Sequence, residues 1–188
     1  MLSRYRVFLL FVLVLLASSP AHALLQFQAG AVALPTTGRP TSLAAAADGT
    51  FLVGTVGRTR SDELFAIDPG PDGRTPTVAW SLDLGVRVNG IAVDGTHAYL
   101  ATADDAAELM VVDLTLRQRV ASFDVPGTAD GWSVTIAEPG VVDLVVRRSA
   151  GPERYRLSVA TDPISVLSTA EDPTAGKPTR PEGLRRYR

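Results

Sequence analysis

Short apolar runs separated by turn residues fill the chain between residues 42 and 168. Near residue 122 the run alternates, because Ser122 and Asp124 are each flanked by apolar residues. This period of two is typical of a strand with one buried face. The stretches 63–68 and 108–113 are almost continuously apolar, which favours strands near a buried centre. No stretch beyond the N-terminal segment has helical spacing with caps, so the pattern predicts an all-β fold.

The apolar runs repeat with a spacing of 45 residues. The segment 63–68 (ELFAID) recurs as 108–113 (ELMVVD), and the same shift leads to 153–158 (ERYRLS). A turn signal precedes each copy, at Asp48-Gly49, Asp94-Gly95 and Pro139-Gly140. Such turns favour hairpins, because glycine accepts a positive φ without a steric penalty.

Each unit therefore predicts four short strands. The expected ranges, unit by unit, are 42–46, 51–56, 63–68 and 77–84; then 90–93, 98–103, 108–113 and 119–125; then 132–137, 141–147, 153–159 and 164–168. Four strands in roughly 45 residues are typical of one blade of a β-propeller.

The units also resemble the LVIVD-type repeat family, which is named for a Leu-Val-Ile-Val-Asp third strand. The matching residues are 109–113 (LMVVD) and, more loosely, 64–68 (LFAID), while 89–102 looks like that family's first hairpin. The resemblance covers about 43–170 and is poor in the third unit, where arginines stand on the third strand. It implies exported or surface propellers, mostly without a defined activity, and no catalytic motif.

The predicted fold class is all-β, a partial β-propeller-like array of three four-stranded blades. Closed propellers have about four to eight blades. Three blades therefore form an open arc or close by self-association. Two chains paired about a two-fold axis would supply six blades, so a homodimer completing a ring is one expectation. The alternative is a structural or degenerate fragment of a longer propeller.

The two ends of the chain differ from the repeats. Arg4 and Arg6 precede an apolar run of eleven residues, 7–17, and small residues flank His22, which predicts a signal peptide cleaved after Ala23. A retained anchor is the alternative, although a membrane-spanning helix needs roughly 20 apolar residues. The expected organisation is a signal peptide at 1–23, a leading strand fragment at 24–41, the repeat domain at 42–170 and a disordered tail at 171–188.

Composition narrows the chemistry. Without Arg4 and Arg6 the chain keeps 16 basic and 20 acidic residues, and the repeats carry no basic run, so nucleic acid is not an expected partner. There are no cysteines, which excludes disulfides, thiol catalysis and a lipidated N-terminal cysteine. His97 is the one histidine beyond the signal segment, so a site with two histidines is excluded within one chain. We expect an exported protein, periplasmic or secreted, with no membrane span after cleavage.

Candidate chemistry is sparse. His97 follows a tight turn, where an exposed hairpin histidine is the ordinary interpretation, and Asp104-Asp105 is a loop pair. The equivalent residues Glu63, Glu108 and Glu153 could form a ring of carboxylates, but a solvated glutamate at the start of a strand is ordinary. We therefore predict no catalytic residue, no metal site and no cofactor.

The loops that join fourth strands to first strands are the predicted binding face, because rigid sheets hold variable connections. They contain Arg87, Asn89, Asp130 and Trp132, although Trp132 is alternatively a core anchor. The first functional hypothesis is an exported, non-enzymatic module that binds a protein or a cell-envelope component. The second is a metal-dependent propeller hydrolase or lactonase using carboxylates and Asn89, and the third is a purely structural domain.

Overall fold

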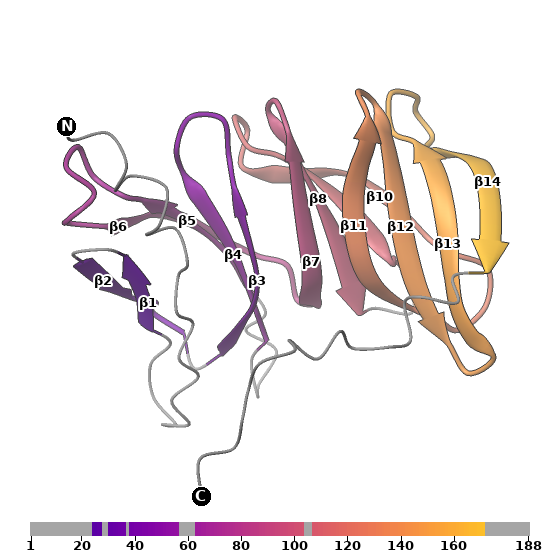
Figure 1. Cartoon of the computed structure of the whole chain (residues 1–188), viewed down its shortest axis with the longest axis horizontal. Coiled ribbons are helices and arrows are strands. Elements are labelled where there is room, and N and C mark those ends of the chain that lie inside the picture. Colours follow the sequence, from indigo (N-terminus) through magenta and orange to yellow (C-terminus); the bar gives the residue numbers. More distant parts are fainter. Residues whose placement is uncertain (1–23, 28–29, 37, 57–62, 104–106, 172–188) are drawn as a thin grey trace, which may run out of the picture.

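The computed structural model describes residues 24–27, 30–36, 38–56, 63–103 and 107–171. All regular structure in these ranges is β-strand, arranged as one two-stranded and three four-stranded antiparallel sheets (Figure 1). The predicted all-β class and the three four-stranded units are therefore confirmed. The expected signal peptide, residues 172–188 of the expected tail and the pair Asp104-Asp105 lie outside the described residues. Glu171, expected to begin the disordered tail, is instead the last residue of a strand.

The three large sheets follow one another along the chain, and we call them the first, second and third blades. The first contains β3 (Arg39–Ala45), β4 (Phe51–Val56), β5 (Glu63–Asp68) and β6 (Thr77–Asp83). The second contains β7 (Arg87–Asp94), β8 (His97–Ala103), β9 (Leu109–Asp113) and β10 (Gln118–Phe123). The third contains β11 (Asp130–Glu138), β12 (Val141–Arg148), β13 (Gly151–Ser158) and β14 (Ser165–Glu171). A leading pair, β1 (Leu24–Phe27) and β2 (Gly30–Ala33), precedes them.

Each blade is a meander in which every strand pairs with the next. The turn glycines behave as the sequence predicts, since Gly49 and Gly95 have φ of 89° and 57°. The first strands of the blades, β3, β7 and β11, begin three, three and two residues before the expected positions. Their extra residues pair with the ends of β4, β8 and β12, so the candidate residues Arg87, Asn89, Asp130 and Trp132 lie on strands rather than in loops.

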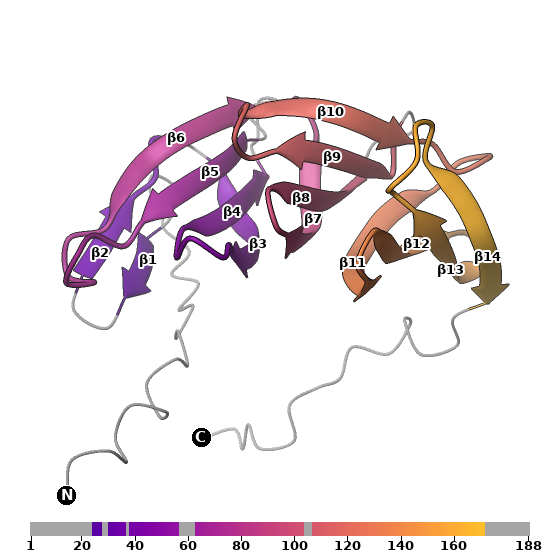
Figure 2. The ribbon, with the colours of Figure 1, turned by 90° about the horizontal axis from the view of Figure 1, so that it is seen from above.

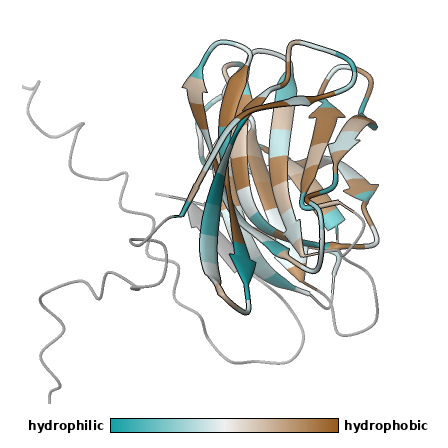
Figure 3. Ribbon diagram, turned by 90° about the vertical axis from the view of Figure 1, so that its right-hand side faces the viewer, coloured by the Kyte–Doolittle hydropathy of each residue, from teal (hydrophilic) through white to brown (hydrophobic). Residues whose placement is uncertain are grey.

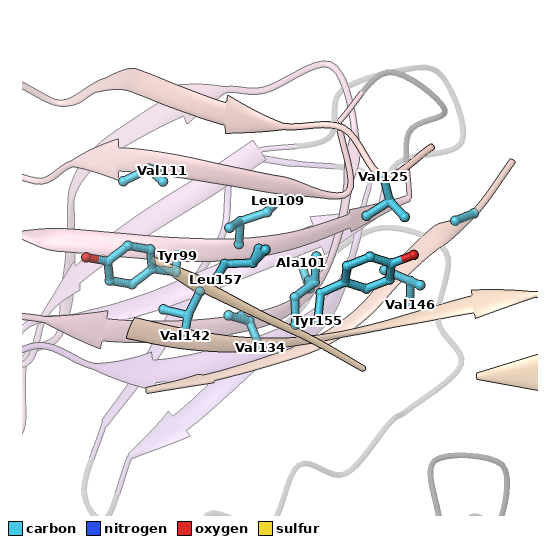
Figure 4. Close-up of a cluster of buried hydrophobic side chains, with 12 residues drawn as sticks. Tyr99, Ala101, Leu109, Val111, Val125, Val134, Val142, Val146, Tyr155 and Leu157 are labelled. Atoms are coloured by element: carbon cyan, nitrogen blue, oxygen red, sulfur yellow. The ribbon is translucent and has the colours of Figure 1, made fainter. Parts of the chain in front are cut away.

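The blades form an arc, with β3, β7 and β11 on its concave side and β6, β10 and β14 on its convex side (Figure 2). Apolar layers fill the spaces between successive sheets. In β9, Met110 and Val112 pack toward the first blade, whereas Leu109 and Val111 pack toward the third (Figure 4). A strand buried on both faces needs apolar residues at every position, which explains the continuous runs in the sequence. Each fully buried side chain of this size stabilises the fold by about 1.5–3 kcal/mol.

A further apolar layer covers the first blade on the side away from the second. Val32 and Leu34 pack there against Val53, Phe65 and Ile67. The third blade differs, because its side facing away from the second blade is largely polar. Figure 3 views the molecule from this end and shows hydrophilic stretches on the nearest strands.

Candidate functional site

The first strand of each blade carries a β-bulge at the same place. The pairing register shifts by one residue there, which leaves Thr41, Asn89 and Trp132 outside the paired ladders. A bulge bends the strand and redirects a side chain. Two of the predicted binding residues, Asn89 and Trp132, therefore occupy equivalent positions in successive blades.

In the first two blades the bulge residue is bonded to the following blade. The hydroxyl of Thr41 donates to the main-chain oxygen of Val88, and Asn89 Nδ2 donates to the main-chain oxygen of Gly131 at 2.6 Å. Both acceptors immediately precede the bulge residue of the next blade. Asn89 thus joins two blades, and its side-chain nitrogen serves a structural hydrogen bond.

Gly131 allows the second and third blades to approach closely. A Cβ on this buried residue would lie 2.8 Å from both the main-chain nitrogen and the main-chain oxygen of Thr102. That nitrogen is already donating to the main-chain oxygen of Glu108 at 3.0 Å. Only glycine fits here, and this contact fixes the positions of Asp130 and Trp132 on either side.

Trp132 has no following blade among the described residues and lies at the surface. Its side chain is 39% exposed, so the alternative prediction of a core anchor is wrong. The guanidinium carbon of Arg147 lies 3.9 Å from the centre of the indole ring, which is a cation–π contact. Arg147 is opposite Asp130 in the register of β11 with β12, and both are exposed.

The surface of the third blade that points away from the second blade is called here the free face. Its residues alternate along the strands with Val134, Leu144, Tyr155 and Leu157, which pack toward the second blade. Arg156 forms an ion pair with Asp143, with 3.5 Å between Nε and Oδ1. The polar and aromatic members of the free face include Asp130, Trp132, Thr135, Glu138, Asp143, Arg147, Arg154 and Arg156.

The repeat explains why this face is polar. The 45-residue shift carries Leu109 and Val111, which pack toward the following blade, onto Arg154 and Arg156. Both arginines are exposed. A blade face that no other blade covers has to tolerate water. In the sequence these arginines stand out as a departure from the repeat, and their spacing of two is the signal for a solvated face.

The four predicted site residues do not form one surface. Asp130 and Trp132 lie on the third blade, and Asn89 reaches them only through its bond to Gly131. Arg87 is half-buried at the start of β7, opposite Ala103, and its buried Nε has no hydrogen-bond partner among the described residues. The structure therefore places Asp130 and Trp132 on one face with Arg147, and Arg87 and Asn89 elsewhere.

Glu108 differs from the solvated strand-start residue that the sequence predicts. It is fully buried, and its Oε2 accepts a hydrogen bond from the main-chain N–H of Val125 at 2.7 Å. Its Oε1 has no partner in the described part of the chain. Burial raises the pKa of Glu108, and the charge of Asp124 adds to this, whereas the bond from Val125 and the charge of Arg148 oppose it.

Glu153, the equivalent residue of the third blade, has the opposite environment. Arg148 Nε donates to its Oε2 at 2.9 Å, and the hydroxyl of Tyr155 donates to the same oxygen at 2.8 Å. These two bonds lower the pKa of Glu153. In the first blade, burial and the nearby Asp83 raise the pKa of Glu63. All three glutamates belong to third strands or their approaches, two strands outward from the concave side.

Within the described ranges, no group of three or more histidine, aspartate or glutamate side chains is close enough to share a metal ion. His97 is half-buried, with Nδ1 3.4 Å from the hydroxyl of Thr96. The same ranges contain no helix of the length and apolarity that a membrane crossing requires.

Two solved structures share this arrangement of blades. BamB from Moraxella catarrhalis superposes with a TM-score of 0.56 and 16% identity, over 76% of this chain and 39% of BamB. The fold is a partial β-propeller. A Bacteroides caccae protein of unknown function superposes on the partial propeller with a TM-score of 0.52 and 13% identity, over 75% of this chain and 49% of its own. The partial propeller thus spans less than half of either protein.

No protein-family model matches the sequence of the partial propeller. No curated protein matches it either. The likeness to solved structures therefore concerns the fold, and the resemblance to the LVIVD-type family stays a prediction.

Proposed function

We propose that this partial propeller is an exported, non-enzymatic module that binds a protein through the free face of its third blade. The observation that carries the proposal is the exposed indole of Trp132 beneath the guanidinium of Arg147. Tryptophan and arginine dominate binding energy at protein interfaces, because each combines a large contact area with directed N–H donors. A partner that covers this pair removes apolar ring surface from water.

The charge of the free face indicates the kind of partner. The whole chain has a net charge of −2, yet Arg147, Arg154 and Arg156 gather on this one sheet surface. Asp143 pairs with Arg156, and Asp130 lies opposite Arg147, so acids on the same face neutralise part of that charge. The face therefore suits a partner segment with carboxylates, which bind guanidinium groups through paired hydrogen bonds. Complementary charge also speeds association.

Export is part of the proposal and is supported by the sequence of the first 23 residues. A basic start, an apolar run and small residues before Leu24 meet the requirements of a signal peptidase. The intact mass of the protein recovered from the extracytoplasmic fraction tests this directly. A mass that begins at Leu24 supports export, and a mass that includes Met1 in that fraction indicates a retained anchor.

A photo-crosslinking residue in place of Thr135 tests the binding site. Thr135 is exposed and pairs with Asp143, so it lies on the free face without taking part in the Trp132–Arg147 contact. The matched control position is Ser122, which is exposed on β10 of the second blade. Illumination in cells that export the protein should give a discrete protein adduct at 135 and none at 122. The substitution Trp132→Ala should remove the adduct.

Two outcomes would contradict the proposed site. The first is the same set of adducts from positions 135 and 122, which indicates unselective contact. The second is an adduct that persists with Trp132→Ala and with Arg147→Ala, which places recognition elsewhere. An adduct with a polysaccharide or lipid would contradict a protein partner. It would show that the free face binds an anionic component of the cell envelope instead.

A further inference from the structure

The leading pair of strands has the form of half a blade. Leu34 precedes the bulge residue Thr41 by seven residues, as Val125 precedes the bulge residue Trp132 by seven. Leu34 and Val125 are both fully buried. By this equivalence β2 takes the place of a fourth strand, and β1, its antiparallel neighbour, takes the place of a third. First and second strands for this unit are missing from the described residues.

The half-blade covers only part of the first blade. Leu43, Ile91 and Val134 each follow the bulge residue of their strand by two positions. Val134 is 5% exposed against the second blade, and Ile91 is partly buried against the first. Leu43 is 42% exposed, and none of the described strands lies in front of it as an inner strand. The uncovered surface continues the apolar layer that Val32 and Leu34 form with Val53.

The backbone is also incomplete at this place. In the described chain β1 pairs with β2 alone, so its other edge presents free N–H and C=O groups. An edge of this kind binds an added strand through main-chain hydrogen bonds, and side-chain pockets select the sequence. By comparison with the other blades, a complete blade would add two strands here, one along β1 and one along the concave side beside β3.

A second copy of this chain is a poor occupant. The surface it would bring in ring order is the free face of its third blade, which carries Arg154 and Arg156. Packing these arginines against Leu43 would remove their charges from water without a matching acid in the apolar layer. The polar face and the apolar face are therefore mismatched.

We propose that a β-hairpin of another protein completes the leading half-blade, with one strand paired to β1 and the other covering Leu43. The existing interfaces specify its chemistry. Its face toward the first blade is apolar, as in the other blades. Its inner strand carries a side-chain donor such as asparagine or threonine, because Thr41 and Asn89 each donate to the blade that follows. The carbonyl of Pro40 is the equivalent acceptor. This inference is independent of the proposed function at the free face.

The hairpin 87–103 of this chain, made as a labelled synthetic peptide, is a suitable probe. It contains β7 and β8, carries Asn89, and presents Ala92, Tyr99 and Ala101, which pack toward the third blade in the intact protein. Titration with the full chain, followed by fluorescence anisotropy, should show saturable binding. A peptide with Asn89→Ala should bind several-fold more weakly, because it lacks the donor for Pro40.

Matched variants of the full chain locate the binding. Leu43→Ser should weaken peptide binding about tenfold, the effect of losing most of one leucine burial. Val120→Ser should leave it unchanged, because Val120 has a similar exposure of 45% but lies on β10, at the convex side. Both side chains are exposed, so thermal unfolding should confirm that both variants fold.

Three results would overturn the inference. They are no saturable binding of the peptide, equal loss with both variants, or a dimer in analytical ultracentrifugation that Leu43→Ser dissociates. The last result would show that a second copy of this chain, rather than another protein, covers Leu43. Crosslinking at Thr135 tests the opposite end of the arc from peptide binding at Leu43. Either experiment can therefore fail without affecting the interpretation of the other.

Discussion

Asn89 of the second blade donates a hydrogen bond to the main-chain oxygen of Gly131 in the third blade, across 2.6 Å. The acceptor belongs to a buried residue, so water cannot replace the lost donor. Asn89→Ala should therefore lower the free energy of unfolding by about 1–3 kcal/mol. Urea denaturation measures this change. Gln118→Ala, at an exposed position of β10, is the control. Equal stability of the two variants would show that the inter-blade bond is unimportant.

Replacing Gly131 by alanine should destabilise the fold more than replacing Gly90 by alanine. A Cβ on Gly131 would lie 2.8 Å from main-chain atoms of Thr102, whereas a Cβ on Gly90 would lie 3.1 Å from Ser133 Cα. Gly131→Ala should destabilise the fold by about 3 kcal/mol or more, and Gly90→Ala by about 1 kcal/mol. Thermal or urea unfolding of both variants checks the order. The reverse order would contradict the close approach of the blades at Gly131.

Burial of Glu108 should make the protein less stable as the pH rises. Its pKa in the folded protein lies above the ordinary glutamate value of 4.5, so the folded state holds this proton more tightly than the unfolded chain does. The stability that this provides is complete below pH 4.5 and is lost as the pH passes through the raised pKa. Glu108→Gln cannot ionise and should lack this contribution.

Melting temperatures between about pH 4 and pH 8 test the effect of Glu108, since this window contains the ionisation of a raised carboxyl. Glu63 also has a raised pKa, so the difference between the wild type and Glu108→Gln is the informative quantity. Gln118→Ala, at an exposed position of β10, should keep the pH dependence of the wild type, because it changes no titratable group. Parallel profiles for the wild type and Glu108→Gln would refute the prediction.

Glu153 should act in the opposite direction. Its pKa is lowered by the bonds from Tyr155 and Arg148, so its stabilising effect is present above pH 4.5 and is lost as the pH falls through the lowered value. Glu153→Gln should cost about 0.5–1 kcal/mol at pH 7, because the group is partly solvated, and less in strong acid. Denaturation at pH 7 in low and high salt provides the measurement. A loss that high salt does not reduce would exclude an electrostatic origin.

Local periodicity predicted the blades well. The third strand of the first blade spans Glu63–Asp68, as expected from the sequence. A strand buried on both faces consists of consecutive apolar residues, and such a run is easy to recognise. First strands were predicted too short. Arg87 and Asp130 are polar residues at strand ends, and their pairing depends on β8 and β12 rather than on their own hydropathy.

The candidate site was predicted only in part. Trp132 was identified from its place in the repeat, but its exposure depends on the absence of a following inner strand among the described residues. Burial of Glu108 depends on Val125, which lies 17 residues further along the chain. No local pattern indicates such a contact. Arg154 and Arg156 of β13 are evident in the sequence. That they form a solvated face follows only from the structure, which shows which side of the strand points outward.

Arg154 and Arg156 stand where the second blade has Leu109 and Val111, and this difference decides where a further blade could be added. Duplication of the second unit and insertion of the copy ahead of Asp130 would keep apolar sides against apolar sides. The copy would need glycine in place of Val88, because Val88 is equivalent to Gly131 and would meet Thr102 of the preceding unit. The same unit appended after Glu171 would meet guanidinium groups. Evolution or an engineer could therefore lengthen this molecule internally, while the third blade keeps its polar outer face.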